Sequence, residues 1–85
     1  MVYPNNSVVN YRLALIYAEQ KEYVLAHPYA LMVTALYPFN YEGQLLLAKI
    51  EIARGNILEA KNALMVCLQF NPKAKEALAM WELVK

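Results

Sequence analysis

Aspartate is absent from this 85-residue sequence, and cysteine and histidine occur once each, as Cys67 and His27. A structural zinc site needs about four cysteine or histidine ligands, so these two residues cannot form one. A single cysteine forms no internal disulfide, which leaves the redox compartment open. A triad or a Cys-His dyad needs the imidazole beside its nucleophile, and Cys67 is expected on a different helix from His27. We therefore expect no enzyme activity, no metal and no cofactor.

Charged residues are also scarce, at 18% of the chain, and their signs are mixed. Eight Lys and Arg residues oppose seven Glu residues, which gives a net charge of +1 and no basic stripe for phosphates. Nucleic acid is therefore not expected as a partner. Two glutamate pairs, Glu19 with Glu22 and Glu51 with Glu59, fit solvated helix faces better than catalytic carboxylate pairs, because nothing else in the sequence builds a pocket.

The start of the chain lacks the basic segment and apolar run of a signal peptide. This favours a soluble, cytoplasmic protein, although the compartment stays open. The longest uncharged stretch, residues 23–41, approaches the length of a membrane span. It is interrupted by His27, Pro28, Pro38 and Asn40, and the longest apolar piece between the prolines has the length of a core helix. Membrane association through this stretch is therefore the third and last of our hypotheses.

Hydrophobic residues, by contrast, make up 60% of the chain. At this length folding removes only about 60% of the surface that the unfolded chain exposes. Some apolar side chains must therefore remain outside unless another surface covers them. The composition predicts a protein partner, a neighbouring domain or a second copy of the chain.

Three of the four prolines, Pro4, Pro38 and Pro72, are equally spaced along the chain. Equal intervals of this length are the signature of an internal repeat. A shift by the same interval superposes four identical pairs of small or apolar residues: Leu13 and Leu47, Ala14 and Ala48, Ile16 and Ile50, and Ala26 and Ala60. These are positions at which repeated packing needs the same side chain.

Within each period the apolar residues recur at helical spacing. In the second period a helix is predicted over residues 41–54, where Gly55-Asn56 interrupts the pattern. Another helix is predicted over residues 57–70, and Asn71-Pro72 ends it because proline disfavours a helical conformation in the residue before it. In the first period Pro28 leaves two alternatives: a kinked second helix, or one that starts late with Pro28 in its first turn.

A 34-residue helix-turn-helix unit with these landmarks resembles the tetratricopeptide repeat. That family places a leucine, a small residue and an aromatic residue in its first helix, and an alanine, a large apolar residue and a proline in its second. Residues 7–40 fill these slots with Leu13, Ala14, Tyr17, Ala26, Ala30 and Pro38, and residues 41–74 fill them with Leu47, Ala48, Ala60, Leu64 and Pro72. The departures are Asn10 and Gln44 in aromatic slots, Glu51 in the slot that Tyr17 fills, and Ala30, which is small for its slot.

The resemblance implies an all-α, right-handed solenoid of α-hairpins over residues 1–85. It would contain two repeats, residues 7–40 and 41–74, and a C-terminal capping helix in residues 75–85. Pro4 occupies the closing slot of a repeat that the sequence lacks, which indicates excision from a longer array. The alternative is that residues 3–5 only lead into a helix capped by Asn6 or Ser7.

The resemblance also implies a binding groove, because the first helix of each pair lines the concave face in this family. In this sequence that face would hold Val8, Tyr11, Leu15, Ala18 and Glu19 from the first repeat, and Glu42, Leu45, Lys49, Ile52 and Ala53 from the second. The capping helix would add Glu76, Ala79 and Leu83 to this face unless it folds over the groove. The lining is mostly apolar, so it suits an amphipathic helix or a hydrophobic strand of a partner. The alternative is that Tyr11, Leu15, Leu45 and Ile52 only pack against a neighbouring helix.

A second apolar surface is expected on the convex face. At positions matched by the repeat, the earlier hairpin carries Leu25, Tyr29 and Met32 where the later one has Glu59, Ala63 and Val66. The first three are spaced like one stripe of a helix, and such a stripe is usually covered by another surface. The leading hypothesis is therefore a non-catalytic scaffold for a protein or peptide partner. The alternative is a self-assembly module that forms a homo-oligomer through its exposed apolar faces.

Overall fold

The computed structural model describes residues 6–85 and contains five helices and no strand in that part of the chain. The helices are α1 (Ser7–Glu19), α2 (Tyr23–Leu36), α3 (Tyr41–Arg54), α4 (Ile57–Phe70) and α5 (Lys75–Val84). The all-α class is confirmed for these residues, as are the two helices predicted over residues 41–54 and 57–70. The expectations that rest on Pro4 and on residues 3–5 fall outside the described residues.

Asparagine caps begin two of the helices at positions matched by the repeat. The Oδ1 atom of Asn6 accepts a hydrogen bond from the backbone N–H of Val9 at 3.0 Å, at the start of α1. The Oδ1 atom of Asn40 accepts one from the backbone N–H of Gly43 at 2.7 Å, at the start of α3. Each cap satisfies one of the N–H groups that the first turn of a helix leaves without a partner. The repeat is therefore visible in the capping as well as in the apolar pattern.

The turns inside the two hairpins also correspond. Gly55 follows α3 with φ +82°, in the left-handed region that glycine adopts without steric cost. Lys21, its counterpart in the first repeat, has φ +61° in the turn after α1. A lysine there brings its Cβ atom close to the following carbonyl oxygen, which destabilises the turn. The first hairpin thus keeps the turn geometry of the second with a less suitable residue.

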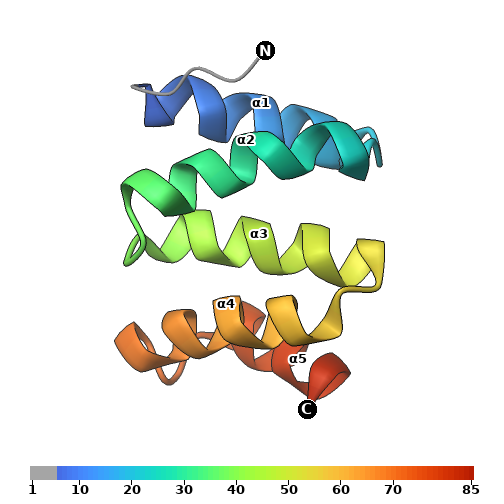
Figure 1. Ribbon diagram of the computed structural model, residues 1–85. Helices are drawn as coiled ribbons and strands as arrows, with labels where there is room; N and C mark the ends of the chain where they lie inside the picture. Colours follow the sequence, from blue (N-terminus) through green and yellow to red (C-terminus); the bar gives the residue numbers. More distant parts are fainter. Residues whose placement is uncertain (1–5) are drawn as a thin grey trace.

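The helices pack in consecutive pairs and form two layers (Figure 1). The first helices of the pairs, α1 and α3, contact each other, and α3 contacts α5, so these three form one layer. The second helices, α2 and α4, form the other layer and lie nearer the viewer in Figure 1. Helix α2 contacts both α1 and α3, and α4 contacts both α3 and α5. Helix α3 is therefore the central element, with neighbours on both sides.

Two clusters of buried side chains hold these helices together. The first joins α1, α2 and α3 through Ala14, Ala26, Tyr29, Ala30, Leu46, Leu47 and Ile50. The second joins α3, α4 and α5 through Leu45, Ala48, Ala60, Ala63, Leu64, Cys67, Ala74, Ala77, Met80 and Val84. Many members are alanines, which allow the helix axes to approach closely. Because α3 contributes to both clusters, it is the most deeply buried helix.

Helix α2 begins at Tyr23 and runs through Pro28. The alternative of a helix that starts late with Pro28 in its first turn is therefore wrong. Proline has no N–H to donate to the carbonyl of Val24, and Val24 is 78% exposed, so this carbonyl lies at the surface. Of the five helices in residues 6–85, none combines the length and apolar character needed to cross a bilayer.

Candidate functional site

A hollow with a volume of about 550 Å³ lies beside the first half of α1. It is lined by Ser7, Val8, Tyr11, Arg12, Leu15, Val33, Tyr37, Asn40 and Glu42. Val8, Tyr11, Leu15 and Glu42 belong to the groove predicted from the sequence. Arg12, Val33, Tyr37 and Asn40 were not predicted to line it.

The helix pairing explains why these residues meet. Helices α1 and α2 form an antiparallel hairpin, so the start of α1 lies beside the end of α2, where Val33 and Tyr37 are. The chain then turns into α3, so Asn40 and Glu42 reach the same place. Val33, Tyr37 and Asn40 were left out of the predicted groove because that prediction used only the first helix of each pair.

A glycine sets how closely α2 and α3 approach at the floor of the hollow. Val33 is 4% exposed and forms part of this floor. A Cβ atom on Gly43 would lie only 2.9 Å from Cγ1 of Val33 and 3.0 Å from Oδ1 of Asn40. Only glycine therefore fits there without moving the floor or the cap of α3.

The lining of the hollow is apolar with one charge of each sign. Tyr11 and Leu15 are half-buried along α1, and Val8 is 63% exposed at the edge. Arg12 and Glu42 are exposed, and neither forms an ion pair with another residue in the range 6–85. An apolar surface with an exposed cation and an exposed anion in its lining suits a segment with an apolar stripe and mixed charges beside it.

The second half of the predicted groove is partly covered, since Leu45 is buried whereas Lys49 and Ala53 stay exposed. Leu45 is 7% exposed and belongs to the core cluster of α3, α4 and α5, and Ile52 packs against that cluster. The Nζ atom of Lys49 lies 2.6 Å from Oε2 of Glu76, so an ion pair joins α3 to α5. The assignment of Leu45 to an open groove is thus wrong, because α5 lies along the same side of α3. Ala18 is half-buried and packs against the first cluster.

The predicted second interface is displaced by one residue. Tyr29 is 8% exposed and its ring stacks on Tyr17, with 5.8 Å between the ring centroids, so its outward placement is wrong. Its counterpart Ala63 is also buried, at 3%. Leu25 is exposed and Met32 is half-buried. The exposed stripe of α2 consists of Val24, Pro28, Leu31 and Ala35.

Sequence reasoning missed one buried charged group, the carboxylate of Glu51. Glu51 is 3% exposed, so its placement on a solvated face is wrong. Its Oε2 atom lies 3.1 Å from Nε2 of His27, and its Oε1 atom accepts hydrogen bonds from Arg54 and Asn56, each at 3.1 Å. The pairing of Glu51 with Tyr17 across the repeat was the available signal, because Tyr17 occupies an inward slot. The network ties α2 to α3 and to the start of α4.

Chemistry at the remaining reactive groups is limited. Burial raises the pKa of the Cys67 thiol to about 11, and its Sγ atom donates a weak hydrogen bond to the carbonyl of Tyr41 at 3.6 Å. Such a thiol is protonated at neutral pH and is a poor nucleophile. Among residues 6–85 no three His, Cys, Asp or Glu side chains gather in a way that could hold a metal ion.

Comparison with protein-family models, with curated proteins and with solved structures found no match to this chain.

Proposed function

We propose that this protein is a non-catalytic interaction scaffold of the tetratricopeptide type, a right-handed solenoid of two repeats closed by α5. It binds an apolar or amphipathic segment of a partner protein in the hollow beside α1. The observation that carries this proposal is the apolar lining of the hollow by Val8, Tyr11, Leu15 and Val33, flanked by Arg12 and Glu42. The repeat period in the sequence and the consecutive pairing of the helices support the assignment to this type of repeat.

The size of the hollow suits a small number of side chains. Its volume of about 550 Å³ falls within the range of roughly 300–1,000 Å³ that is usual for binding pockets. Helix α1 has 13 residues and is therefore about 20 Å long. Because α5 covers Leu45 and the hollow is lined mainly by α1, the bound segment extends along α1. A helix of roughly 13 residues, or an extended strand of about six, matches that length.

The chemistry of the lining favours an amphipathic helix. Side chains at positions i, i+3, i+4 and i+7 of such a helix form one stripe that can lie against Tyr11 and Leu15. Its polar side chains could then pair with the guanidinium of Arg12 and the carboxylate of Glu42, which both line the hollow. Tyr11 and Tyr37 supply large amphipathic rings, which are enriched at the centres of protein interfaces.

Fluorescence anisotropy tests this proposal with a fluorescein-labelled 13-residue helical peptide that has leucines at positions 1, 4, 5 and 8. A scrambled peptide of the same composition is the control for sequence pattern. We expect the patterned peptide to bind at least about tenfold more tightly than the scrambled one. The substitution Val8→Glu places a charge at the edge of the hollow and should raise the dissociation constant by about tenfold or more.

Leu83→Glu is the matched control variant, because Leu83 is 70% exposed on α5, away from the hollow. It should leave peptide affinity unchanged, and circular dichroism should show that both variants keep their helical content. Equal affinity for the two peptides would refute the proposal, as would an equal loss of binding in both variants.

A further inference from the structure

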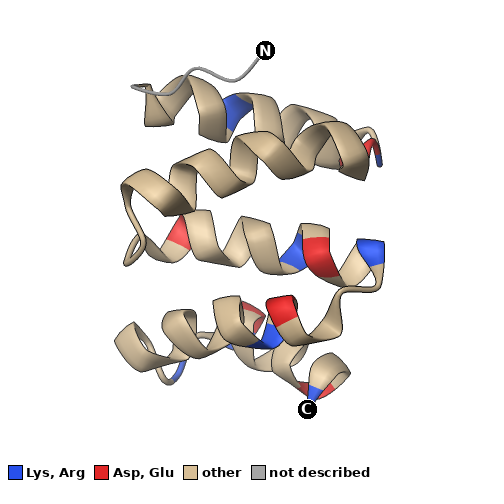
Figure 2. Ribbon diagram, in the orientation of Figure 1, with Lys and Arg blue, Asp and Glu red and all other residues tan. Residues whose placement is uncertain are grey.

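The outer face of α2 is an exposed apolar surface that the peptide-binding site does not use. The four residues of its stripe, Val24, Pro28, Leu31 and Ala35, are all exposed and uncharged. No Lys, Arg or Glu occurs anywhere in α2, and its ribbon has no charged residue along its whole length in Figure 2. A helix in a soluble protein usually presents its charged residues on the side away from the core, so this stripe is unusual.

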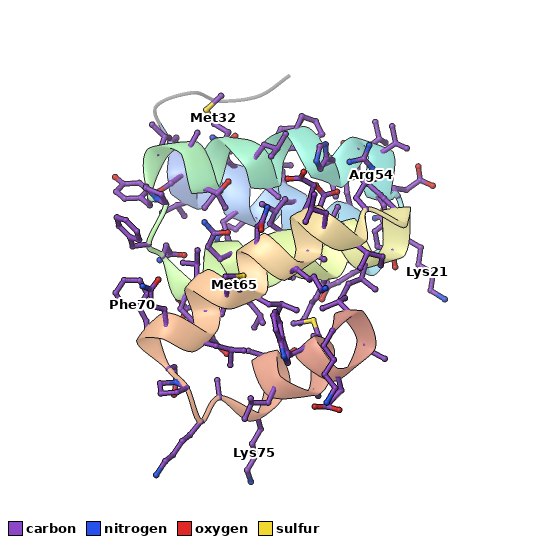
Figure 3. The ribbon with its side chains drawn as sticks, turned by 60° about the horizontal axis from the view of Figure 1, so that its bottom comes forward. Lys21, Met32, Arg54, Met65, Phe70 and Lys75 are labelled. Atoms are coloured by element: carbon purple, nitrogen blue, oxygen red, sulfur yellow. The ribbon has the colours of Figure 1, made fainter. Side chains whose placement is uncertain are left out.

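Helix α4 lies in the same layer without contacting α2, and it also exposes apolar residues at matched positions. Leu58 and Met65, the repeat counterparts of Val24 and Leu31, are 68% and 57% exposed. Both helices belong to the layer nearer the viewer in Figure 1, and Met65 lies on the forward side of α4 in Figure 3. Near the end of α4, Phe70 is exposed and contacts the ring of Phe39 edge-on, with 5.7 Å between the centroids.

The exposed apolar area approaches that of a stable interface. The large side chains that contribute are Val24, Leu25, Leu31, Leu36, Leu58, Met65 and Phe70, which are between 39% and 78% exposed. If each leaves roughly 100 Å² uncovered, the seven together expose about 700 Å². A standard protein interface buries about 800 Å² on each partner. The face is therefore large enough for one specific contact, provided that α2 and α4 both take part.

We propose that this outer face pairs with the same face of a second copy of the chain, about a two-fold axis near the middle of α2. In a two-fold contact, a residue close to the axis meets its own copy, so any charge there would be repelled. Helix α2 carries no charge that could cause such repulsion. Pro28 and Ala35 are small enough for two helices to approach to the usual separation of about 8–10 Å.

Charge also argues against other occupants. A strongly acidic or basic partner would find no complementary charge on α2. A helix that lies in a membrane surface normally carries Lys or Arg beside its apolar stripe, and α2 has neither. A second copy of the chain would present its own α2, whose outer face is equally free of charge.

Analytical ultracentrifugation of the full chain from about 1 to 200 μM tests the pairing. We expect a mass twice the 9.7 kDa of one chain at the upper concentrations, with reversible dissociation on dilution. Leu31→Glu places two carboxylates near the axis and should raise the dimer dissociation constant at least about 100-fold. Leu83→Glu, at a more exposed leucine on α5, should leave the dissociation constant unchanged. A monomer at all concentrations would overturn the proposal, as would equal behaviour of the two variants.

Oxidative cross-linking gives a second measurement that does not depend on the folding of Leu31→Glu. In a Cys67→Ala background, L31C should form a covalent dimer on mild oxidation, whereas L83C should not. Cross-linking of L83C alone, or of both variants to the same extent, would place the contact elsewhere and refute the proposal. Flotation of a monomeric protein with phosphatidylcholine vesicles would likewise refute it, and would assign the face to a membrane.

Discussion

The two hairpins share a repeating sequence pattern but differ in how deeply they are buried. Ile16 in α1 and Ile50 in α3 occupy matched positions, yet Ile16 is 47% exposed and Ile50 is fully buried. Helix α1 buries only Asn10 and Ala14, whereas α3 buries eight residues. The difference arises because α3 has helices on both sides and α1 has a described neighbour on one side only. For these two isoleucines, the position of the helix in the stack, and not the residue type, decides how deeply the side chain is buried.

A second difference is chemical. Tyr17 and Glu51 are matched across the repeat, and both point inward. Tyr17 stacks on Tyr29 inside its own hairpin, whereas Glu51 bonds to His27 of the preceding hairpin. The first hairpin therefore uses this slot to hold its own two helices together. The second hairpin uses it to hold the two hairpins to each other.

The largest expected effect comes from the matched isoleucines. Ile50→Ala should lower the free energy of unfolding by about 3 kcal/mol, because it removes three buried carbon atoms and leaves a cavity. Ile16→Ala should cost about 1 kcal/mol or less, since nearly half of that side chain already contacts water. Urea unfolding followed by circular dichroism measures both values. Equal losses would show that the hairpins are equally buried in solution, contrary to the structure.

Removal of the Glu51 carboxylate should have the next largest effect. Glu51→Ala leaves the donors of His27, Arg54 and Asn56 without their acceptor and should cost about 2 kcal/mol. Glu51→Gln keeps the shape and one acceptor oxygen, so it should cost roughly half as much. Glu59→Ala, at an exposed glutamate of α4, is the control and should change the stability by less than about 0.5 kcal/mol. If Glu51→Ala proved as harmless as this control, the network would not hold the hairpins together.

The two hairpins should also differ at alkaline pH. Cys67 is matched by Val33 in the first hairpin, and burial raises the pKa of the Cys67 thiol from 9.0 to about 11. The folded protein disfavours the thiolate. The free energy of unfolding is therefore unaffected by this thiol below pH 9 and falls as the pH rises toward 11. The loss should reach about 1–2 kcal/mol near pH 10.5. Urea midpoints at about pH 8 and about pH 10.5 should separate the wild type from Cys67→Val, which lacks this loss. An identical pH dependence in both proteins would contradict the burial of the thiol.

The smallest predicted effect concerns the matched turns. Lys21→Gly should stabilise the protein by about 0.5–1 kcal/mol, because glycine relieves the left-handed strain but adds entropy to the unfolded chain. Gly55→Lys should destabilise it by a similar amount through backbone strain alone, since a Cβ atom at Gly55 meets no other atom within 4 Å. Thermal unfolding of the two variants, compared with wild type, measures both changes. Two shifts of the same sign would mean that the turns are not equivalent.

Local features of the chain allowed much of the fold to be predicted. The bounds of α3 and α4 follow from the apolar spacing, from Gly55 and from the Asn71-Pro72 pair, all of which act within a few residues. The groove was predicted only in part, because Val8, Tyr11 and Leu15 line the hollow whereas Leu45 is buried under α5. The convex stripe was placed one residue away from its true position, which is enough to turn Tyr29 into the core. A helix turns by about 100° per residue. An error of one residue in the position of a stripe therefore moves side chains between the inner and outer faces.

The amino-acid sequence by itself determined the bounds of α3 and α4, and that the hairpins recur at a fixed period. These features depend on neighbours along the chain, such as caps, prolines and the spacing of apolar residues. Only the tertiary structure decided which matched residue is buried, that Glu51 meets His27, and that α5 covers Leu45. Those outcomes depend on helices far apart in the sequence, because burial and ion pairing are set by the side chains that packing brings together.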